Sequence, residues 1–200
     1  MERQSAGTVL FSHGHQSGPD GQKIRALRPT AETAGWTTES IDYRDLRDAP
    51  AERAERLVER IDALDGPIIL VGSSMGGWVS MAAAEARNCA GLFLMAPALF
   101  LEHRVPDAPL RQSYQPKTDA ITIVHGWSDE IIPWRNSLRF ARQLSASLHL
   151  LDSDHRLEDA IADLKTLLAR FLNRQSPGGK PEGRPPEAAH PEINSRGYTQ

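Results

Sequence analysis

Five short apolar runs and one strand-like segment at 38–43, separated by longer amphipathic stretches, constrain the fold of this chain more than any other feature. The runs 67–71 and 91–95 are almost entirely apolar. They lack the polar alternation of a strand with one wet face, so we expect each strand to be covered on both sides. The expected strands are 8–11, 38–43, 67–71, 91–95, 120–124 and 148–151.

The stretches between the runs repeat apolar or small residues at helical spacing, as Leu57, Ile61 and Leu64 do. The expected helices are 22–34, 51–64, 75–86, 134–144 and 157–171. Strands that alternate with helices predict a three-layer α/β/α sandwich around a mostly parallel sheet of about six strands. In such a sheet the reactive crevice lies beyond the carboxyl ends of the strands, so functional residues should follow strands directly.

Ser74 is the candidate nucleophile. The sequence GSSMG at 72–76 fits G-x-S-x-G, between an expected strand and an expected helix. A sharp turn there strains the serine backbone and exposes its hydroxyl, while the glycines allow neighbouring chain to pass closely. The alternative is a glycine-rich turn with an incidental serine. Ser73 fits less well, because a motif centred on it would need glycine at positions 71 and 75.

A serine hydroxyl needs a positioned base, and His155 is the candidate. It follows the last expected strand and precedes the closing helix, on the same sheet edge as Ser74. His125 precedes Gly126 at a strand end, which indicates a role in shaping the following turn. Three other histidines are weaker candidates for the base. His190 lies in the expected tail, His149 in an expected strand and His103 in an irregular region.

Asp129 is the candidate acid, because it lies in the loop between strand 120–124 and the helix that Pro133 begins. A buried aspartate there would hold the imidazole in its productive tautomer. A helix-capping or turn aspartate is the competing interpretation. Glu130 is a neighbouring alternative, and Asp154 could pair with His155 only in a strained local geometry.

Acyl transfer also needs donors aimed at the oxyanion. The Met75 amide follows the nucleophile, and the loop after the first strand offers the amide of His15, with Gln16 close behind. His13 and His15 form an H-x-H pair, which also occurs in zinc sites, although a third ligand is not evident. A metal site at this pair is therefore an alternative interpretation.

Composition limits the remaining function classes. The chain has 200 residues, 40% hydrophobic, and a net charge of −3, which argues against a nucleic-acid partner. Cys89 is the only cysteine, so no internal disulfide can form, as suits a reducing cytoplasm. We see no signal peptide and no apolar run of about 20 residues, so we expect a cytoplasmic protein without a membrane partner.

The Pro- and Gly-rich segment 175–200 should be a disordered tail after a single domain at 1–174.

The segments SHGHQSGPDGQK, VGSSMGG, HGWSDEIIP and SDHRL together resemble the α/β-hydrolase superfamily, over residues 6–173. They look most like its small lidless bacterial esterases, the YqiA-like group. The resemblance implies hydrolysis of an ester or thioester through an acyl-enzyme, with Ser74, Asp129 and His155 as triad and no cofactor. It also implies oxyanion amides at His15 and Met75.

Two departures from the family pattern limit that resemblance. The first strands of larger members are missing, and no cap domain is inserted between residues 95 and 120. The apolar start of that stretch, residues 96–101, could form an acyl-binding wall or a packed short helix.

The competing functions are a non-catalytic binding protein that keeps the fold and a metal-dependent hydrolase that uses His13 and His15. Neither the natural substrate nor the oligomeric state can be derived from the sequence.

Overall fold

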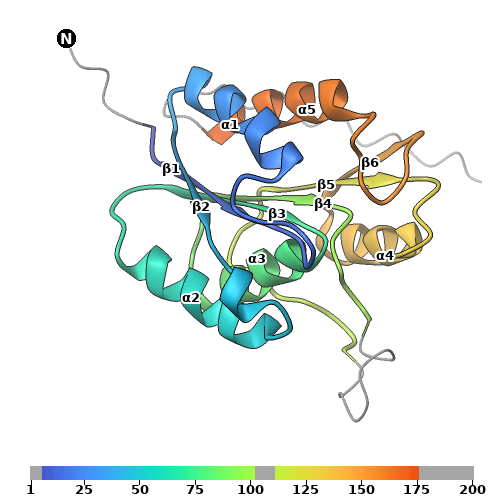
Figure 1. Ribbon diagram of the computed structural model, residues 1–200, viewed down its shortest axis with the longest axis horizontal. Helices are drawn as coiled ribbons and strands as arrows, with labels where there is room; N and C mark the ends of the chain where they lie inside the picture. The colour runs from blue at the N-terminus through green and yellow to red at the C-terminus, as the bar shows by residue number, and fades with distance from the viewer. Residues whose placement is uncertain (1–5, 102–110, 176–200) are drawn as a thin grey trace, which may run out of the picture.

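Six parallel strands form one sheet in the order β2-β1-β3-β4-β5-β6 (Figure 1). The computed structural model describes residues 6–101 and 111–175. The strands are β1 (Thr8–Ser12), β2 (Thr37–Ile41), β3 (Ile68–Ser73), β4 (Gly91–Met95), β5 (Ile121–Gly126) and β6 (Ser147–Leu151). Every neighbouring pair is parallel, which confirms the expected sheet.

Helices cover both faces of the sheet, as Figure 1 shows. One face carries α1 (Gln22–Thr33) and α5 (Ile161–Gln175). The other carries α2 (Pro50–Asp62), α3 (Met75–Ala86) and α4 (Trp134–Leu144), and a short 3-10 turn, η1 (Arg44–Leu46), precedes α2. The three-layer α/β/α sandwich is thus confirmed. Among the described residues, no helix is long and apolar enough to cross a membrane.

The sheet separates two apolar clusters, one under each helical layer. Leu70 and Leu94 belong to the cluster on the α2–α3–α4 side, and Val71 and Phe93 to the cluster on the α1–α5 side. All six residues of β3 are buried. This explains why the sequence of this strand shows no alternation: consecutive side chains enter two different cores.

Three details differ from the sequence prediction. Leu157 was expected in the closing helix, but it precedes α5 with φ 53° and is fully buried in the loop. Because Leu157 is buried like the apolar residues of α5, the sequence shows helical spacing at a position where the backbone is not helical. The η1 turn was not expected, and β5 extends two residues further, through His125 and Gly126.

The segment after β4 is packed rather than open. Leu99 and Phe100 are buried in the core, where the Phe100 ring meets the edge of Tyr114 with centroids 4.9 Å apart. Ala96 and Phe100 have positive φ values, and residues 96–101 contain no helix. Of the two interpretations left open for this stretch, the packed short helix is packed but not helical, and the acyl-binding wall stays a prediction. Residues 102–110 lie outside the described residues, within the stretch predicted to lack a cap. Of the predicted tail at 175–200, Gln175 is the last residue of α5, and residues 176–200 lie outside the described residues.

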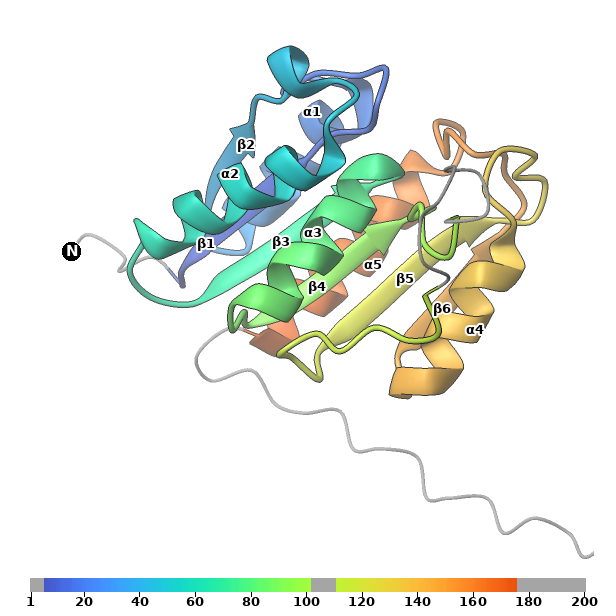
Figure 2. The same ribbon diagram turned by 90° about the horizontal axis from the view of Figure 1, so that it is seen from below.

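The strand register brings the ends of the strands to one edge. Ser12 pairs with Gly72, Ser73 with Met95, and Gly126 with Leu151. Figure 2 shows β3, β4 and β5 pointing to the same end of the molecule, where α3 begins. Residues that follow β1, β3, β5 and β6 are therefore neighbours although they are far apart in the sequence.

Candidate active site

Ser74 lies between β3 and α3 in a strained backbone conformation, with φ 55° and ψ −119°. A non-glycine residue there costs on the order of 1–3 kcal/mol, which surrounding structure must offset. The two motif glycines make the tight turn possible. A Cβ on Gly72 would overlap the Gly76 carbonyl, and one on Gly76 would overlap the carbonyl of Ser12. The expected strain and close passage are both confirmed.

His155 brings its ring to this serine from the loop after β6. Its Nε2 lies 3.0 Å from the Ser74 Oγ. The loop is held from two sides: the Asp154 carboxylate accepts the amides of Arg156 and Leu157, and Lys23 Nζ donates to the Arg156 carbonyl over 2.6 Å. Burial lowers the pKa of that lysine. These bonds fix the loop whose backbone carries the histidine.

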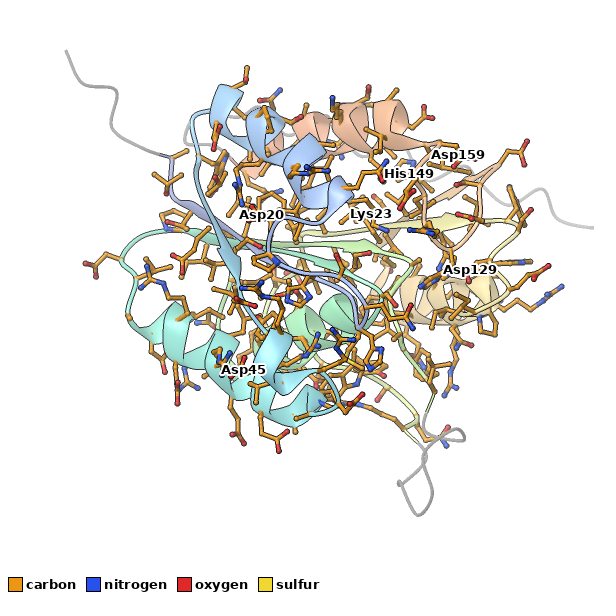
Figure 3. The ribbon with its side chains drawn as sticks, viewed as in Figure 1. Asp20, Lys23, Asp45, Asp129, His149 and Asp159 are labelled. Carbon is orange, nitrogen blue, oxygen red and sulfur yellow. The ribbon has the colours of Figure 1, made fainter. Side chains whose placement is uncertain are left out.

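Asp129, labelled in Figure 3, lies in the loop between β5 and α4, and its carboxylate is hydrogen-bonded to His155. Its Oδ2 accepts the His155 Nδ1 proton at 2.7 Å, and its Oδ1 accepts the amides of Ile131 and Ile132 at 2.9 and 2.8 Å. The carboxylate is completely buried. Burial alone would raise the pKa of Asp129, but hydrogen bonds from His125, His155 and the Ile132 amide outweigh it and hold that pKa well below its usual range. The acid is therefore ionised and fixed.

His125 is the residue of this site whose role the sequence did not reveal. Its Nε2 lies 2.9 Å from Asp129 Oδ2 and 3.0 Å from the Ile132 carbonyl, and its Nδ1 lies 2.7 Å from the Ser137 Oγ. Two acceptors at Nε2 place the proton there, so Nδ1 accepts the Ser137 hydroxyl. The contact with Ile132 confirms the expected role in the following turn. The bond to the acid is an addition, and a histidine in a strand buried on both faces was the available signal.

The loop after β1 lies against the candidate nucleophile. A Cβ built on Gly14 would be in ordinary contact with the Ser74 Cβ, at 3.6 Å. Met75 is the first residue of α3, so its amide has no partner within the helix. The structure thus places both sequence-predicted oxyanion residues, His15 and Met75, in segments that adjoin Ser74.

The H-x-H pair is divided between two different structural roles. His13 is buried, and both of its ring nitrogens are hydrogen-bonded to backbone groups of Gly14 and Tyr43. His15 pairs instead with Asp48, Nε2 to Oδ1 at 2.6 Å. No group of three or more His, Cys, Asp or Glu side chains is arranged for a metal ion in residues 6–101 and 111–175. To bind a metal, His13 would have to give up one of its two backbone partners.

The sequence alternatives to the triad positions lie elsewhere. Glu130 is exposed, Asp154 is occupied by the turn of its own loop, and Ser73 is a buried strand residue. His149 is a half-buried residue of β6, and burial lowers its pKa. Ser74, His155 and Asp129 are the sequence candidates that the structure joins by hydrogen bonds.

Comparison with known proteins identifies the family to which the fold belongs. The family model described as the alpha/beta hydrolase family matches residues 4–190. The protein named palmitoyl-protein thioesterase ABHD10, mitochondrial, is 25% identical in Mus musculus over 215 residues, covering 80% of this chain and 72% of that protein. Its Homo sapiens counterpart is 26% identical over 216 residues, with 80% and 70% covered.

Solved structures agree with this result. A protein of the alpha/beta superfamily from Xanthomonas campestris pv. campestris has a TM-score of 0.73 and 32% identity, covering 84% of this chain and 98% of that one. Mouse alpha/beta hydrolase domain-containing protein 10 has a TM-score of 0.71 at 24% identity, covering 84% and 90%, and shares the fold. By the family match over most of its length and by this relative, the chain belongs to the alpha/beta hydrolase family.

Proposed function

We propose that the protein is a serine hydrolase that cleaves a carboxylic ester or an acyl thioester through an acyl-enzyme on Ser74. One observation carries the proposal: a strained serine, a histidine and a buried carboxylate form a continuous chain, with 3.0 Å from Oγ to Nε2 and 2.7 Å from Nδ1 to Oδ2. In this arrangement a base can remove the serine proton while a fixed carboxylate stabilises the resulting imidazolium.

The reaction follows from these positions. Ser74 Oγ attacks the acyl carbon, and its proton passes to His155 Nε2, whose ring is oriented by Asp129. The amides of His15 and Met75 stabilise the oxyanion. Collapse breaks the bond to the leaving group, and the alkoxide or thiolate departs with the proton from Nε2. Water then repeats the sequence, with His155 as base, and releases the acid and free Ser74.

The relatives support hydrolysis and favour testing thioesters beside esters. The mouse and human proteins at 25 and 26% identity are named palmitoyl-protein thioesterases. An acyl thioester is therefore a substrate class that we propose alongside simple esters. Membership of the small lidless YqiA-like bacterial group and a location in the reducing cytoplasm, where the single Cys89 would stay reduced, are likewise proposals.

A fluorophosphonate probe tests the nucleophile directly. Wild-type protein should be labelled once, and Ser74→Ala should not be labelled. Short p-nitrophenyl esters and acyl-coenzyme A thioesters then measure turnover. Ser74→Ala, His155→Ala and Asp129→Asn should each lower kcat by about 10³-fold or more, because members of such a unit act together.

Neighbouring residues of the same type provide the controls. Ser73→Ala and Glu130→Gln remove a hydroxyl and a carboxylate that lie beside the proposed residues but outside the hydrogen-bonded chain, so both should keep turnover near wild type. Equal labelling of wild type and Ser74→Ala would refute the nucleophile. Absence of both labelling and turnover in the wild type would favour a non-catalytic binding protein. Loss of turnover with a chelator would favour the metal-dependent alternative.

A further inference from the structure

His13 fixes its tautomer through two backbone hydrogen bonds. Its Nδ1 lies 2.8 Å from the Gly14 carbonyl oxygen, which can only accept. Its Nε2 lies 3.1 Å from the Tyr43 amide, which can only donate. The ring is therefore neutral, with the proton on Nδ1 and a lone pair on Nε2. Both nitrogens are occupied, so this histidine has no free position from which to exchange a proton with substrate.

The bond to Gly14 sets the direction of the next peptide. The Gly14 carbonyl also accepts the Ser17 amide at 3.3 Å, so two donors hold this oxygen. The Gly14–His15 peptide is trans, and in a planar trans peptide the N–H points opposite to the C=O. The His15 amide is thus turned away from the His13 ring. In the part of the chain that the structure describes, no backbone acceptor pairs with this amide.

That peptide lies at the candidate nucleophile. A Cβ on Gly14 would come within 3.5 Å of the Ser73 carbonyl and 3.6 Å of the Ser74 Cβ. The first turn of α3 packs directly beneath the end of β1, where Gly76 faces the carbonyls of Ser12 and His13. An amide of this loop is therefore available beside Ser74, and its direction depends on which way the Gly14 carbonyl is held.

From this geometry we propose that His13 is a positioning residue: its ring holds the Gly14 carbonyl and thereby aims the His15 amide at the oxyanion. The inference depends on the proposed function, because it assigns a residue that prepares one of the two proposed oxyanion donors. It also gives the first histidine of the H-x-H pair a role that requires no metal.

A buried network prevents the His13 ring from moving. The Tyr43 hydroxyl and the Ser12 Oγ are 3.1 Å apart, and the His13 and Tyr43 rings are tilted against one another with centroids separated by 5.3 Å. The Arg53 guanidinium lies 5.3 Å from the Tyr43 ring centroid and donates to the carbonyls of Leu46, Arg47 and His13. Arg53 is fully buried. The imidazole is therefore clamped between β1 and the segment after β2.

Two substitutions separate the two bonds of the ring. In His13→Asn the side-chain amide can donate from about the position of Nδ1, which keeps the bond to Gly14. In His13→Gln the side-chain carbonyl can accept from about the position of Nε2, which keeps the Tyr43 bond and loses the Gly14 bond. Loss of one oxyanion donor lowers kcat by about 10²–10³-fold in serine hydrolysis, and a misdirected donor should cost about 10–100-fold.

We expect His13→Gln to lower kcat with KM within about twofold, because the oxyanion forms only in the transition state. His13→Asn should restore kcat to within about fivefold of wild type. A trifluoromethyl ketone, whose hemiketal oxyanion occupies the same donors, should lose affinity for His13→Gln by the same factor as kcat/KM. The acidic limb of the pH–rate profile should not move, since His13 transfers no proton.

Three outcomes would overturn the inference while wild-type turnover and Ser74 labelling stand. They are a kcat of His13→Gln equal to wild type, a loss confined to KM, and equal losses in the glutamine and asparagine variants. If wild-type protein neither turns over nor labels at Ser74, the proposed function fails instead. If the variants do not fold, ¹⁵N-histidine NMR of the wild type decides: Nδ1–H with an unprotonated Nε2 supports the inference, and the opposite tautomer refutes it.

Discussion

Replacing His125 with leucine tests how the acid of this site is held. Asp129 Oδ2 accepts from both His155 and His125, and the His125 ring also accepts the Ser137 hydroxyl. A hydrogen bond to a charged group contributes about 1.5–3 kcal/mol, and a buried hydroxyl left without a partner costs about 1–3 kcal/mol. Both His125 and Ser137 are fully buried. We therefore expect His125→Leu to lower the free energy of unfolding by about 3–5 kcal/mol.

A second substitution, Ser137→Ala, measures the cost of leaving the Ser137 hydroxyl without its partner. Adding Ser137→Ala to His125→Leu removes the group that would be left unpaired, so the double variant should recover about 1–2 kcal/mol. His125→Gln keeps a donor near the position of Nε2 and should lose less than the leucine variant. Urea unfolding followed by fluorescence measures these proteins together with the single variant Ser137→Ala. The double-mutant cycle of His125→Leu and Ser137→Ala then gives the coupling free energy between positions 125 and 137.

Turnover of the same variants tests the positioning of the acid. Asp129 keeps its bonds to His155 and to the amides of Ile131 and Ile132, so the site should persist with a less fixed carboxylate. A displacement of about 1 Å can cost about 10²-fold, and we expect kcat of His125→Leu to fall about 10–100-fold. A stability loss below about 1 kcal/mol together with full turnover would refute the view that His125 supports Asp129.

Three further predictions concern the loops and the nucleophile turn. Lys23→Met removes the donor to the Arg156 carbonyl and should lower kcat several-fold with little change in KM; unchanged steady-state kinetics would contradict the role of this bond. Gly76→Ala would force a methyl group against the Ser12 carbonyl and should lower the unfolding free energy by about 1–3 kcal/mol; an unchanged or raised Tm would contradict it. Burial lowers the pKa of His13 from 6.5, so the unfolded chain binds this proton more readily. The stability that follows is present above pH 6.5 and is lost as pH falls, and the wild type should lose more than His13→Asn between pH 7 and 5 in chemical denaturation.

The sequence predicted the architecture well because a buried parallel sheet requires a residue pattern that can be recognised in the sequence. A parallel strand between two helical layers must be apolar on both faces, and all of β3 and β4 satisfies this requirement. The position of Ser74 followed from the same logic, since a strand, a sharp turn and a small-residue helix occur in immediate succession. Chain order then restricted the acid and the base to loops that follow later strands.

The side-chain contacts that fix the site were harder to predict from the sequence. His13 depends on Tyr43, thirty residues away in the chain, and His125 depends on Ser137, which is presented by a different element. Such partners are brought together by strand order and register, which local patterns do not specify. Leu157 shows the same limitation in another form, because burial in a loop with φ 53° imitates the spacing of a helix.

Four histidines lie at this sheet edge, and they differ in the hydrogen-bond partners of their ring nitrogens; His15 pairs its Nε2 with Asp48. His13 uses both nitrogens on backbone groups, and His125 uses both on the Asp129 carboxylate, the Ile132 carbonyl and the Ser137 hydroxyl. His155 uses Nδ1 on Asp129, and among residues 6–101 and 111–175 its Nε2 is hydrogen-bonded to the Ser74 hydroxyl alone, a group that can give up its proton. A ring with two fixed partners can orient its surroundings, but it cannot carry a proton between serine and leaving group. The proposal that His155 is the base therefore rests on its own distance to Ser74, and the occupied rings of His13 and His125 support it.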